Sequence, residues 1–293
     1  MHITNQNKYS LSVVIPTLGG NSLNKTLESI NCGSIVPDEI LVCIPENEVV
    51  MIQDLSFHNL RVLVTPIRGQ VGQRAIGFQA ALYEIVMQLD DDLIIDEYCI
   101  ENLLKTLNSC GPKVAVAPAL INKLTGKSAY KTVDINTVIK RIFYWVMNGK
   151  NGFQPGKIAK SGLNFGFDTD GKSEKVYEVD WLAGGCVMHY SKNLILENFY
   201  PFKGKAYCED IIHSYLLREK NISLYIDSSA CCEVELFNLG NLKHSDYVQF
   251  IIDDYRARKY AMMKFSRYSI RIIFLYISYY THFILSNLIK KLS

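Results

Sequence analysis

Several patterns that would assign this sequence to a familiar class are missing from it. No two cysteines form a Cys-x-x-Cys pair, so the spacing of a structural zinc site is absent. The first ten residues lack the basic-then-apolar pattern of a secretory signal. No run of about 20 apolar residues occurs without polar interruption, so a transmembrane helix is not predicted. We therefore expect a cytoplasmic protein with reduced thiols.

Positive charge is missing from one segment. Between Ala75 and Leu104 there is no Lys, Arg or His, although this segment contains seven carboxylates. Three of them are consecutive, Asp90–Asp92, and like charges in a row repel one another. Either water solvates these carboxylates, or a cation from outside the sequence lies among them. A third interpretation is that the acids only precede a helix, whose dipole favours negative charge at its start.

The overall composition excludes little else. The chain has 293 residues, a net charge of +2 and a pI near 8. It can bury a sizeable core, and nothing in its charge indicates a nucleic-acid partner, so we expect none. Its eight cysteines lie mostly in apolar runs and are interpreted as buried free thiols.

Short apolar runs alternate with helical patterns in the first half of the chain. Strands are expected at 11–15, 39–44, 61–65, 85–89 and 113–120, and helices at 21–30, 70–84 and 97–108. The continuous hydrophobicity of these strands predicts a mainly parallel sheet with helices on both faces. Ligands of such sheets bind at the carboxyl ends of the strands, where Asp90–Asp92 lie.

The second half is less regular. Residues 149–171 contain six glycines and are predicted to form a loop that is either mobile or wraps a ligand. We expect a strand, a turn and a strand at 176–190, a helix at 209–220, and two strands at 222–227 and 230–236. From Ser245 onward the pattern is helical.

The aspartates suit a particular class of metal ion. Residues i and i+2 at a strand end point to the same face, so Asp90 and Asp92 are expected to converge while Asp91 points elsewhere. Oxygen ligands without Cys or His suit Mg²⁺ or Mn²⁺ better than zinc. Such an ion completes its coordination shell with water and phosphate oxygens. The diphosphate of a sugar nucleotide supplies phosphate oxygens of this kind.

Five segments follow one another in the order of a known family. They are LSVVIPTLGGNSLNKTLESI, PDEILVCIPE, RGQVGQRAIGFQAALYEIVMQLDDDLIIDEYCIENLL, WLAGGCVMHY and YCEDIIHSYLLREKNISLYID. The chain resembles the inverting family 2 glycosyltransferases across residues 11–233. This resemblance implies an α/β fold of the GT-A type, which is Rossmann-like with a mixed, mainly parallel sheet flanked by helices. We expect this domain over residues 1–240 and a helical, basic-amphipathic C-terminal extension over 241–293.

The resemblance also implies an activity. Such an enzyme moves a sugar from a nucleotide-diphosphate sugar to a hydroxyl of a glycan or a lipid-linked acceptor. Asp210 would be the general base that removes the proton of this hydroxyl, with Glu209 as the second candidate. Attack opposite the leaving diphosphate inverts the anomeric centre in one step. Alternatively, both acids only cap a helix.

Donor and metal contacts are implied in the same way. Asp92 would ligate Mn²⁺ or Mg²⁺, and Asp90 would contribute to the metal site and contact the ribose or nucleotide. The nucleotide-sugar contacts would further include Pro16, Thr17, Leu18, Glu46, Arg68, Gln70, Gln73, Arg74, Asp91, Gly184 and Gly185.

For two groups of these residues, the chemistry of the side chains is a further reason to expect a contact with the donor. The segment RGQVGQR places two arginines and two glutamines around a helix start, which suits an anion, although a solvated basic turn has the same pattern. Gly184 and Gly185 would let the backbone approach the donor sugar, or they belong to an ordinary tight turn.

Two positions depart from the family pattern. The second strand of the family usually ends in an acid at the nucleotide base, whereas here Ile44 is nearest to that place and Glu46 is the substitute. Many relatives carry a histidine after the strand that follows the ED helix, sometimes as a metal ligand. Glu233 is near that place, so it supplies an oxygen ligand or this ligand is absent.

The composition of the C-terminal extension suggests the location of the protein in the cell. Basic and apolar residues are mixed between Arg256 and Arg271, and an apolar stretch with several tyrosines follows. Tyrosines and flanking lysines suit a membrane interface, so we expect a peripheral protein at the inner face of the cell membrane. The alternatives are that the tail packs on the domain or on a second copy in a homo-oligomer.

Two other functions are weighed against glycosyl transfer. A sugar-phosphate nucleotidyltransferase shares the sheet and the metal, but its glycine-rich, basic signature is missing after VVIPT. A non-catalytic, membrane-associated scaffold of the same fold would need neither Asp90 and Asp92 nor Asp210, and all three are present.

Overall fold

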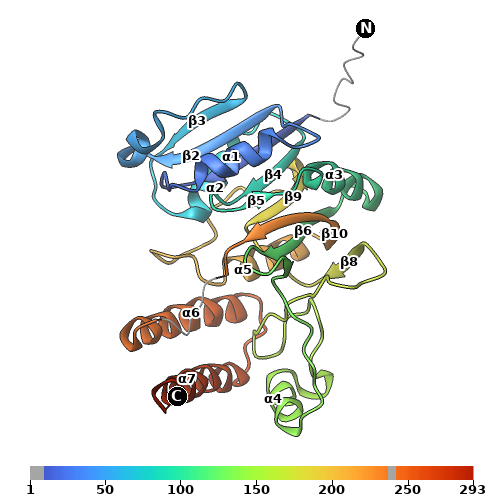
Figure 1. The fold of residues 1–293 in the computed structure, drawn as a ribbon, viewed down its shortest axis with the longest axis vertical. Helices are drawn as coiled ribbons and strands as arrows, with labels where there is room; N and C mark the ends of the chain where they lie inside the picture. Colours follow the sequence, from blue (N-terminus) through green and yellow to red (C-terminus); the bar gives the residue numbers. More distant parts are fainter. Residues whose placement is uncertain (1–9, 237–241, 293) are drawn as a thin grey trace.

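The computed structural model describes residues 10–236 and 242–292. The expected domain boundary at 240/241 lies outside the described residues, as does the N-terminal segment 1–9, where no signal pattern was found. The described chain forms one mixed sheet flanked by helices, with a further layer of helices at one end of its long axis (Figure 1).

A sheet of 10 strands forms the centre of the protein. The strands are Leu11–Pro16 (β1), Glu39–Pro45 (β2), Leu60–Thr65 (β3), Ile85–Leu89 (β4), Ile94–Ile95 (β5), Val114–Asn122 (β6), Lys127–Ser128 (β7), Val176–Val179 (β8), Cys186–Tyr190 (β9) and Ser223–Val234 (β10). Their order is β3-β2-β1-β4-β9-β6-β10-β5, with β7 beside β6 and β8 beside β10. The pairs β1–β2, β2–β3, β1–β4 and β6–β10 are parallel, whereas β9 runs antiparallel between β4 and β6. The predicted mixed α/β sheet is confirmed.

Seven α-helices lie in the described residues. They are Leu23–Asn31 (α1), Gln70–Ala80 (α2), Cys99–Cys110 (α3), Val138–Asn148 (α4), Glu209–Glu219 (α5), His244–Lys264 (α6) and Arg271–Leu292 (α7). Three short 3-10 turns are Glu46–Ile52 (η1), Gly149–Asn151 (η2) and Ser191–Asn193 (η3).

The first strand shows why the apolar runs do not alternate with polar residues. Val13 and Ile15 lie in the same buried cluster as Leu27 of α1, whereas Val14 lies in a second cluster with Phe78 of α2. Both faces of the sheet are therefore covered, so residues that point to either face are apolar. The exception is Ser12, whose buried hydroxyl donates to Glu39 Oε2 at 2.6 Å.

The close approach of α2 to the sheet depends on a glycine. A Cβ atom at Gly77 would lie 2.4 Å from Val14 Cγ1 and 2.6 Å from Cys43 Sγ. Only a residue without a side chain fits there. This contact fixes the helix that begins at the carboxyl ends of β1 and β2 and carries Gln70, Gln73 and Arg74.

The second half differs from the expectation at two places. The segments 222–227 and 230–236 form one strand, β10, whose register shifts between Asp227 and Cys231. The shift occurs where Asp227 accepts hydrogen bonds from Thr106 Oγ1 at 2.6 Å and Ser229 N at 2.8 Å. Helix α4 was not predicted. The two strands expected within 176–190 are present as β8, which pairs with β10, and β9, which pairs with β4 and β6.

The cysteines agree only in part with the expectation. All eight are free, but four are buried, three are half-buried, and Cys32 is exposed.

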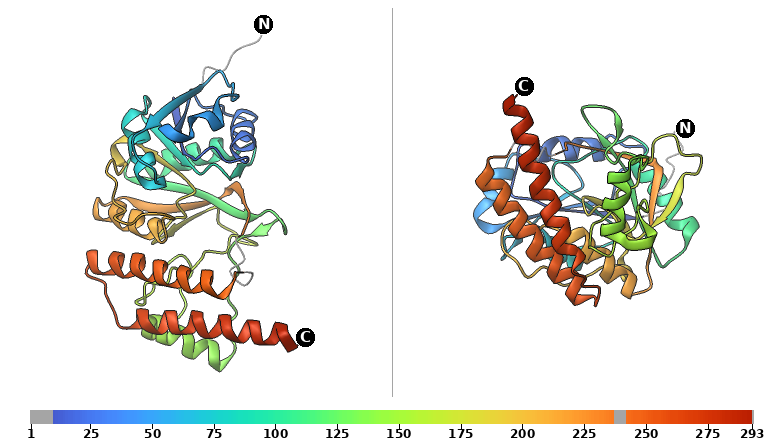
Figure 2. Two further views of the ribbon diagram at one scale, coloured as in Figure 1. Left: turned by 90° about the vertical axis from the view of Figure 1, so that its left-hand side faces the viewer. Right: turned by 90° about the horizontal axis from the view of Figure 1, so that it is seen from below.

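The C-terminal helices form the layer at the end of the molecule. Residues from 244 to 292 are helical apart from the turn between α6 and α7, as the sequence predicts. Helix α7 lies across this end with α4 beside it, and α6 lies between α7 and the sheet domain (Figure 2). Met147 of α4 and Ile272, Leu275 and Tyr276 of α7 share one buried cluster.

A buried ion pair joins this layer to the domain. Arg258 of α6 lies 3.3 Å from Asp254 Oδ2, with 7% and 8% of the two side chains exposed. Arg258 also donates to the backbone oxygen of Gly162 at 2.6 Å, and its Nε donates to Tyr276 Oη of α7 at 3.1 Å. Although burial acts in the opposite direction, the charge of Arg258 holds the pKa of Asp254 below its usual range.

We predict that Arg258→Met destabilises the protein by about 3–5 kcal/mol, because Asp254 is left as an unpaired buried charge. The matched control is Arg256→Met on the same helix. The Arg256 side chain is 64% exposed and lies 3.8 Å from Asp253, so its loss should cost no more than about 1 kcal/mol. Urea unfolding measures both, and equal effects would contradict the structural role of the buried pair.

Candidate active site

The acidic end of β4 meets the end of β1. These strands are parallel neighbours, so Thr17 and Asp90–Asp92 lie at one edge of the sheet. The Thr17 hydroxyl donates to Asp91 Oδ2 and accepts from Gly19 N at 2.9 Å. Burial raises the pKa of Asp91. Asp91 therefore connects the loop after β1 to the loop after β4.

Asp90 and Asp92 have different surroundings. Asp90 Oδ1 accepts from Gln70 Nε2 at 2.7 Å and from Arg74 Nη2 at 3.0 Å. Burial, opposed by Arg74 and assisted by neighbouring carboxylates, raises the pKa of Asp90 to about 6. Asp92 is exposed. One carboxylate of the pair is thus held by the protein, and the other faces solvent.

A single arginine links this edge to α5. Arg74 is 3% exposed, and its Nη1 donates to Glu209 Oε1 at 3.0 Å while its Nη2 contacts Asp90. Glu209 lies 135 residues after Arg74 and is also buried. Folding therefore brings the start of α5 to the acidic end of β4.

Asp210 follows Glu209 in the first turn of α5 and is half-buried. Burial and the Glu209 carboxylate raise the pKa of Asp210 to about 7. Burial and the charge of Asp210 also raise the pKa of Tyr130. Of the two candidate bases, Glu209 is committed to Arg74, whereas Asp210 combines partial exposure with a pKa near neutrality.

The two glycines pack against the acidic residues. A Cβ atom at Gly184 would lie 2.5 Å from Glu209 Oε1, and one at Gly185 would lie 3.3 Å from Asp90 Oδ2. The backbone oxygen of Gly184 accepts from Gln88 Nε2 at 2.5 Å, and that of Gly185 from Asp90 N at 2.7 Å. The turn is a structural part of the site, and this close approach to the carboxylates explains both glycines.

The four polar residues of RGQVGQR have separate tasks. Gln73 is buried and donates to the backbone oxygens of Thr17 and Cys43 at 2.8 and 2.7 Å. Gln70 and Arg74 hold Asp90, as described above. The side chain of Arg68 is 64% exposed and pairs with Glu48 at 2.5 Å. The four side chains do not form one anion-binding site, because three of them already bind backbone oxygens or carboxylates of the protein.

The expected contacts to the nucleotide base differ in accessibility. Leu18 is 41% exposed and Glu46 is exposed in η1, whereas Pro16 and Thr17 are buried. Ile44, which is nearest to the place of the family's acid, is fully buried in the core. Its side chain does not reach the surface of the site.

The remaining candidate metal ligand lies on β10. Glu233 is exposed, and its register partner is Ile94, two residues after Asp92. Within the described ranges, no three His, Cys, Asp or Glu side chains are gathered around a common point.

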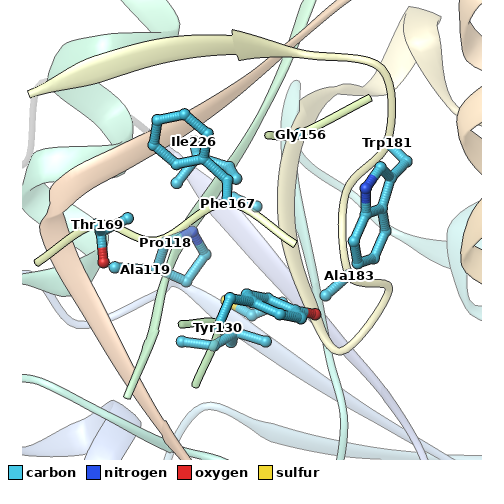
Figure 3. A pocket seen from close by; sticks show the side chains of 12 residues that line it. Pro118, Ala119, Tyr130, Gly156, Phe167, Thr169, Trp181, Ala183 and Ile226 are labelled. Atoms are coloured by element: carbon cyan, nitrogen blue, oxygen red, sulfur yellow. The ribbon is translucent and has the colours of Figure 1, made fainter. Parts of the chain in front are cut away.

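The sequence did not point to the aromatic wall beside the glycine turn. Tyr130 and Trp181 line a small, mostly apolar cavity together with Phe167 and Ala183 (Figure 3). The Tyr130 and Trp181 rings pack edge to face, with 5.7 Å between the ring centres. Trp181 stands in the segment WLAGGCVMHY and could have been singled out, whereas Tyr130 lies in none of the five segments that carried the resemblance.

Comparison with known proteins gives a family and a fold. No curated protein sequence matches. The structure of GalNAc-T7 with UDP, GalNAc and Mn²⁺ superposes with a TM-score of 0.56 at 17% identity, over 86% of this chain and 50% of that one. This chain thus spans about half the length of that protein, and the likeness shows the fold, as the GT-A prediction requires.

A second structure, residues 1–349 of TarS from S. aureus, gives a TM-score of 0.48 at 12% identity, over 87% of this chain and 65% of that one. The model of the family described as "Glycosyl transferase family 2" matches residues 12–159. That match includes β1, α2 and Asp90–Asp92. The chain belongs to glycosyl transferase family 2.

Proposed function

We propose that the chain is a metal-dependent, inverting glycosyltransferase of the hexosyltransferase type. It transfers a sugar from a nucleotide-diphosphate sugar to a hydroxyl of a glycan or a lipid-linked acceptor. The observation that carries this proposal is the buried guanidinium of Arg74, which contacts Asp90 and Glu209 at 3.0 Å each. This contact supports one site that includes the acidic end of β4 and the acidic start of α5.

Asp210 is the proposed general base. Its pKa near 7 lets the carboxylate take a proton from an acceptor hydroxyl at neutral pH. Glu209 is the proposed positioning residue, because it holds Arg74 and adds negative charge beside Asp210. Inversion follows when the activated hydroxyl attacks the anomeric carbon opposite the leaving diphosphate.

Asp92 and Asp90 are the proposed ligands of Mn²⁺ or Mg²⁺, with Glu233 as a third candidate. When bound, the ion neutralises the charge that develops on the leaving diphosphate. Arg74 and Gln70 orient the Asp90 carboxylate for this task. Asp92 is exposed and therefore needs no rearrangement to meet the ion.

The nucleotide is proposed to lie over the ends of β1 and β2, with Pro16, Thr17, Leu18 and Glu46 nearest to the base. Leu18 and Glu46 support this assignment because both are accessible. GalNAc-T7, which has the same fold, was solved with UDP. The C-terminal helices are proposed to keep the enzyme at the inner face of the cell membrane, near a lipid-linked acceptor.

Two alternatives are less well supported. A non-catalytic scaffold has no need of a carboxylate whose pKa is near 7 beside a paired aspartate. A sugar-phosphate nucleotidyltransferase would need a glycine-rich, basic loop after β1, and this chain has PTLGGNSLNK there.

We predict that Asp210→Asn abolishes transfer and donor hydrolysis, with a loss of at least about 100-fold, because general-base catalysis contributes this much or more. Affinity for the nucleoside diphosphate should stay unchanged. Release of UDP, GDP or dTDP from the matching sugar nucleotides measures activity, and calorimetry measures binding. Glu219→Gln at the far end of α5 is the control for a change of charge. Full activity of Asp210→Asn would overturn the assignment of the base.

The pH dependence gives an independent test of the same residue. The Asp210 carboxylate is the active form of the base and is protonated below its raised pKa, so kcat/KM should increase with pH and level off above about 7. An initial-rate series from mildly acidic to mildly basic pH measures this. A flat profile across neutrality would contradict the raised pKa or the role of Asp210.

A further inference from the structure

Helix α4 presents an apolar face at the end of the molecule. Val138, Ile139, Ile142 and Trp145 are 69%, 81%, 57% and 57% exposed. Their spacing puts them on one side of the helix, while Met147 on the other side is buried in the cluster shared with α7. Scattered apolar residues on a surface need no explanation, but a continuous stripe of this kind does.

Helix α7 adds a second stripe beside the first. Ile273, Phe274, Ile277 and Leu288 are between 41% and 56% exposed and recur at helical spacing. The opposite side of α7, which includes Ile272 and Leu275, is buried against α4 and α6. Helix α7 is therefore apolar on two sides, and only one of them is covered by the protein.

The two helices lie next to each other. The Arg271 guanidinium at the start of α7 lies 5.6 Å from the centre of the Trp145 ring and donates to the backbone oxygen of Trp145 at 2.9 Å. Figure 2 shows both helices at the same end of the molecule, with α7 lying across it. The two stripes thus lie on neighbouring helices at one end of the molecule, and we call them together the α4/α7 face.

Positive charge is concentrated on α4 and α7 and on the segments next to them in the chain. Residues 135–167 and 255–293 contain 13 of the 31 Lys and Arg residues and none of the 29 Asp and Glu residues. The rest of the chain is therefore net acidic. Lys140, Arg141 and Lys150 are exposed on or beside α4, and Lys264 and Arg267 are exposed between α6 and α7.

We propose that the α4/α7 face lies flat on an anionic lipid bilayer. Its apolar stripes enter the region between headgroups and acyl chains, and the surrounding cations contact the phosphates. This inference rests on the membrane contact proposed above for the C-terminal helices. It adds α4, a part of the family domain, and assigns an orientation to the whole enzyme.

The packing of α7 indicates that it lies on the membrane and does not cross it. By length and composition alone, Arg271–Ile289 could span a bilayer. However, Tyr276 contacts the buried pair Asp254 and Arg258, and Tyr247 of α6 stacks on Phe283 at 3.8 Å between ring centres. Crossing the membrane would break these contacts along the length of the helix.

Charge complementarity favours a bilayer over a second copy of the chain. A symmetric dimer through this face would bring two sets of cations together without a carboxylate from either segment to pair with them. An anionic bilayer supplies the opposite charge along the whole face.

The chain contains a natural probe of this contact. It has two tryptophans, of which Trp145 is exposed on α4 and Trp181 is 5% exposed in the domain. We expect brominated lipid in phosphatidylglycerol-containing vesicles to quench the tryptophan fluorescence. The quenching should be weaker in phosphatidylcholine vesicles or at high salt. Trp145→Phe should remove the quenched signal. The nucleotide site is not involved, so this outcome is independent of the proposed catalysis.

Variants test whether the face itself makes the contact. Ile139→Ser with Ile142→Ser should weaken binding to the anionic vesicles by about tenfold or more, because two apolar side chains no longer leave water. The matched control replaces Val50 and Leu82, which are 62% and 70% exposed near the N-terminal strands, and it should bind like the wild type. Thermal unfolding and sedimentation without lipid accompany both variants. Binding without Trp145 quenching, equal binding by all variants, or a dimer that only the α4 variant dissociates would overturn the proposal.

Discussion

The contact of Arg74 with Asp90 and Glu209 is the constraint on which the acidic edge of the sheet depends. A buried carboxylate is costly unless it is paired and hydrogen-bonded, so without this guanidinium the start of α5 and the end of β4 would repel each other. One cation does not balance the four nearby acids Asp90, Asp92, Glu209 and Asp210. Burial and this excess of negative charge raise the pKa of Asp90 to about 6 and that of Asp210 to about 7. The same excess of negative charge therefore supports both the proposed metal site and the proposed base.

The start of α5 has a second anchor on the opposite side. Cys208, directly before Glu209, has a left-handed backbone with φ of 55°. Its thiol donates to Asp254 Oδ1 at 2.9 Å, and Asp254 is held in turn by Arg258 and by Tyr276 of α7. The proposed base thus lies between the sheet, through Arg74, and the helical layer, through Asp254. These contacts connect the surface that we propose to contact lipid with the proposed catalytic residues.

The features of the fold and of the candidate site that depend on local sequence patterns were predicted from the sequence. Strand ends, the aspartates at the end of β4, the two acids at the start of α5 and the C-terminal helices followed from runs of hydrophobicity and from family motifs. Pairings between distant segments did not follow, because no local pattern says that β9 inserts between β4 and β6 or that Arg74 meets Glu209. Gln73 and Arg74 were expected to bind an anion, yet the partners of Gln73 are the backbone oxygens of Thr17 and Cys43, and those of Arg74 are two carboxylates. Helix α4 was missed because none of the five sequence segments that carried the resemblance includes it and because it lies next to a glycine-rich loop.

The central claim is that a divalent cation and a diphosphate balance the charge of Asp90–Asp92. Calorimetric titration of UDP, GDP and dTDP, with and without Mn²⁺, tests it most directly in the wild type, in Asp92→Asn and in the control Glu97→Gln, which changes an exposed acid of the same segment. We predict that one nucleotide binds at least about tenfold more tightly with Mn²⁺. This gain should be lost in Asp92→Asn and kept in Glu97→Gln. Binding that is indifferent to Mn²⁺ in the wild type, or a gain that survives in Asp92→Asn, would contradict the account.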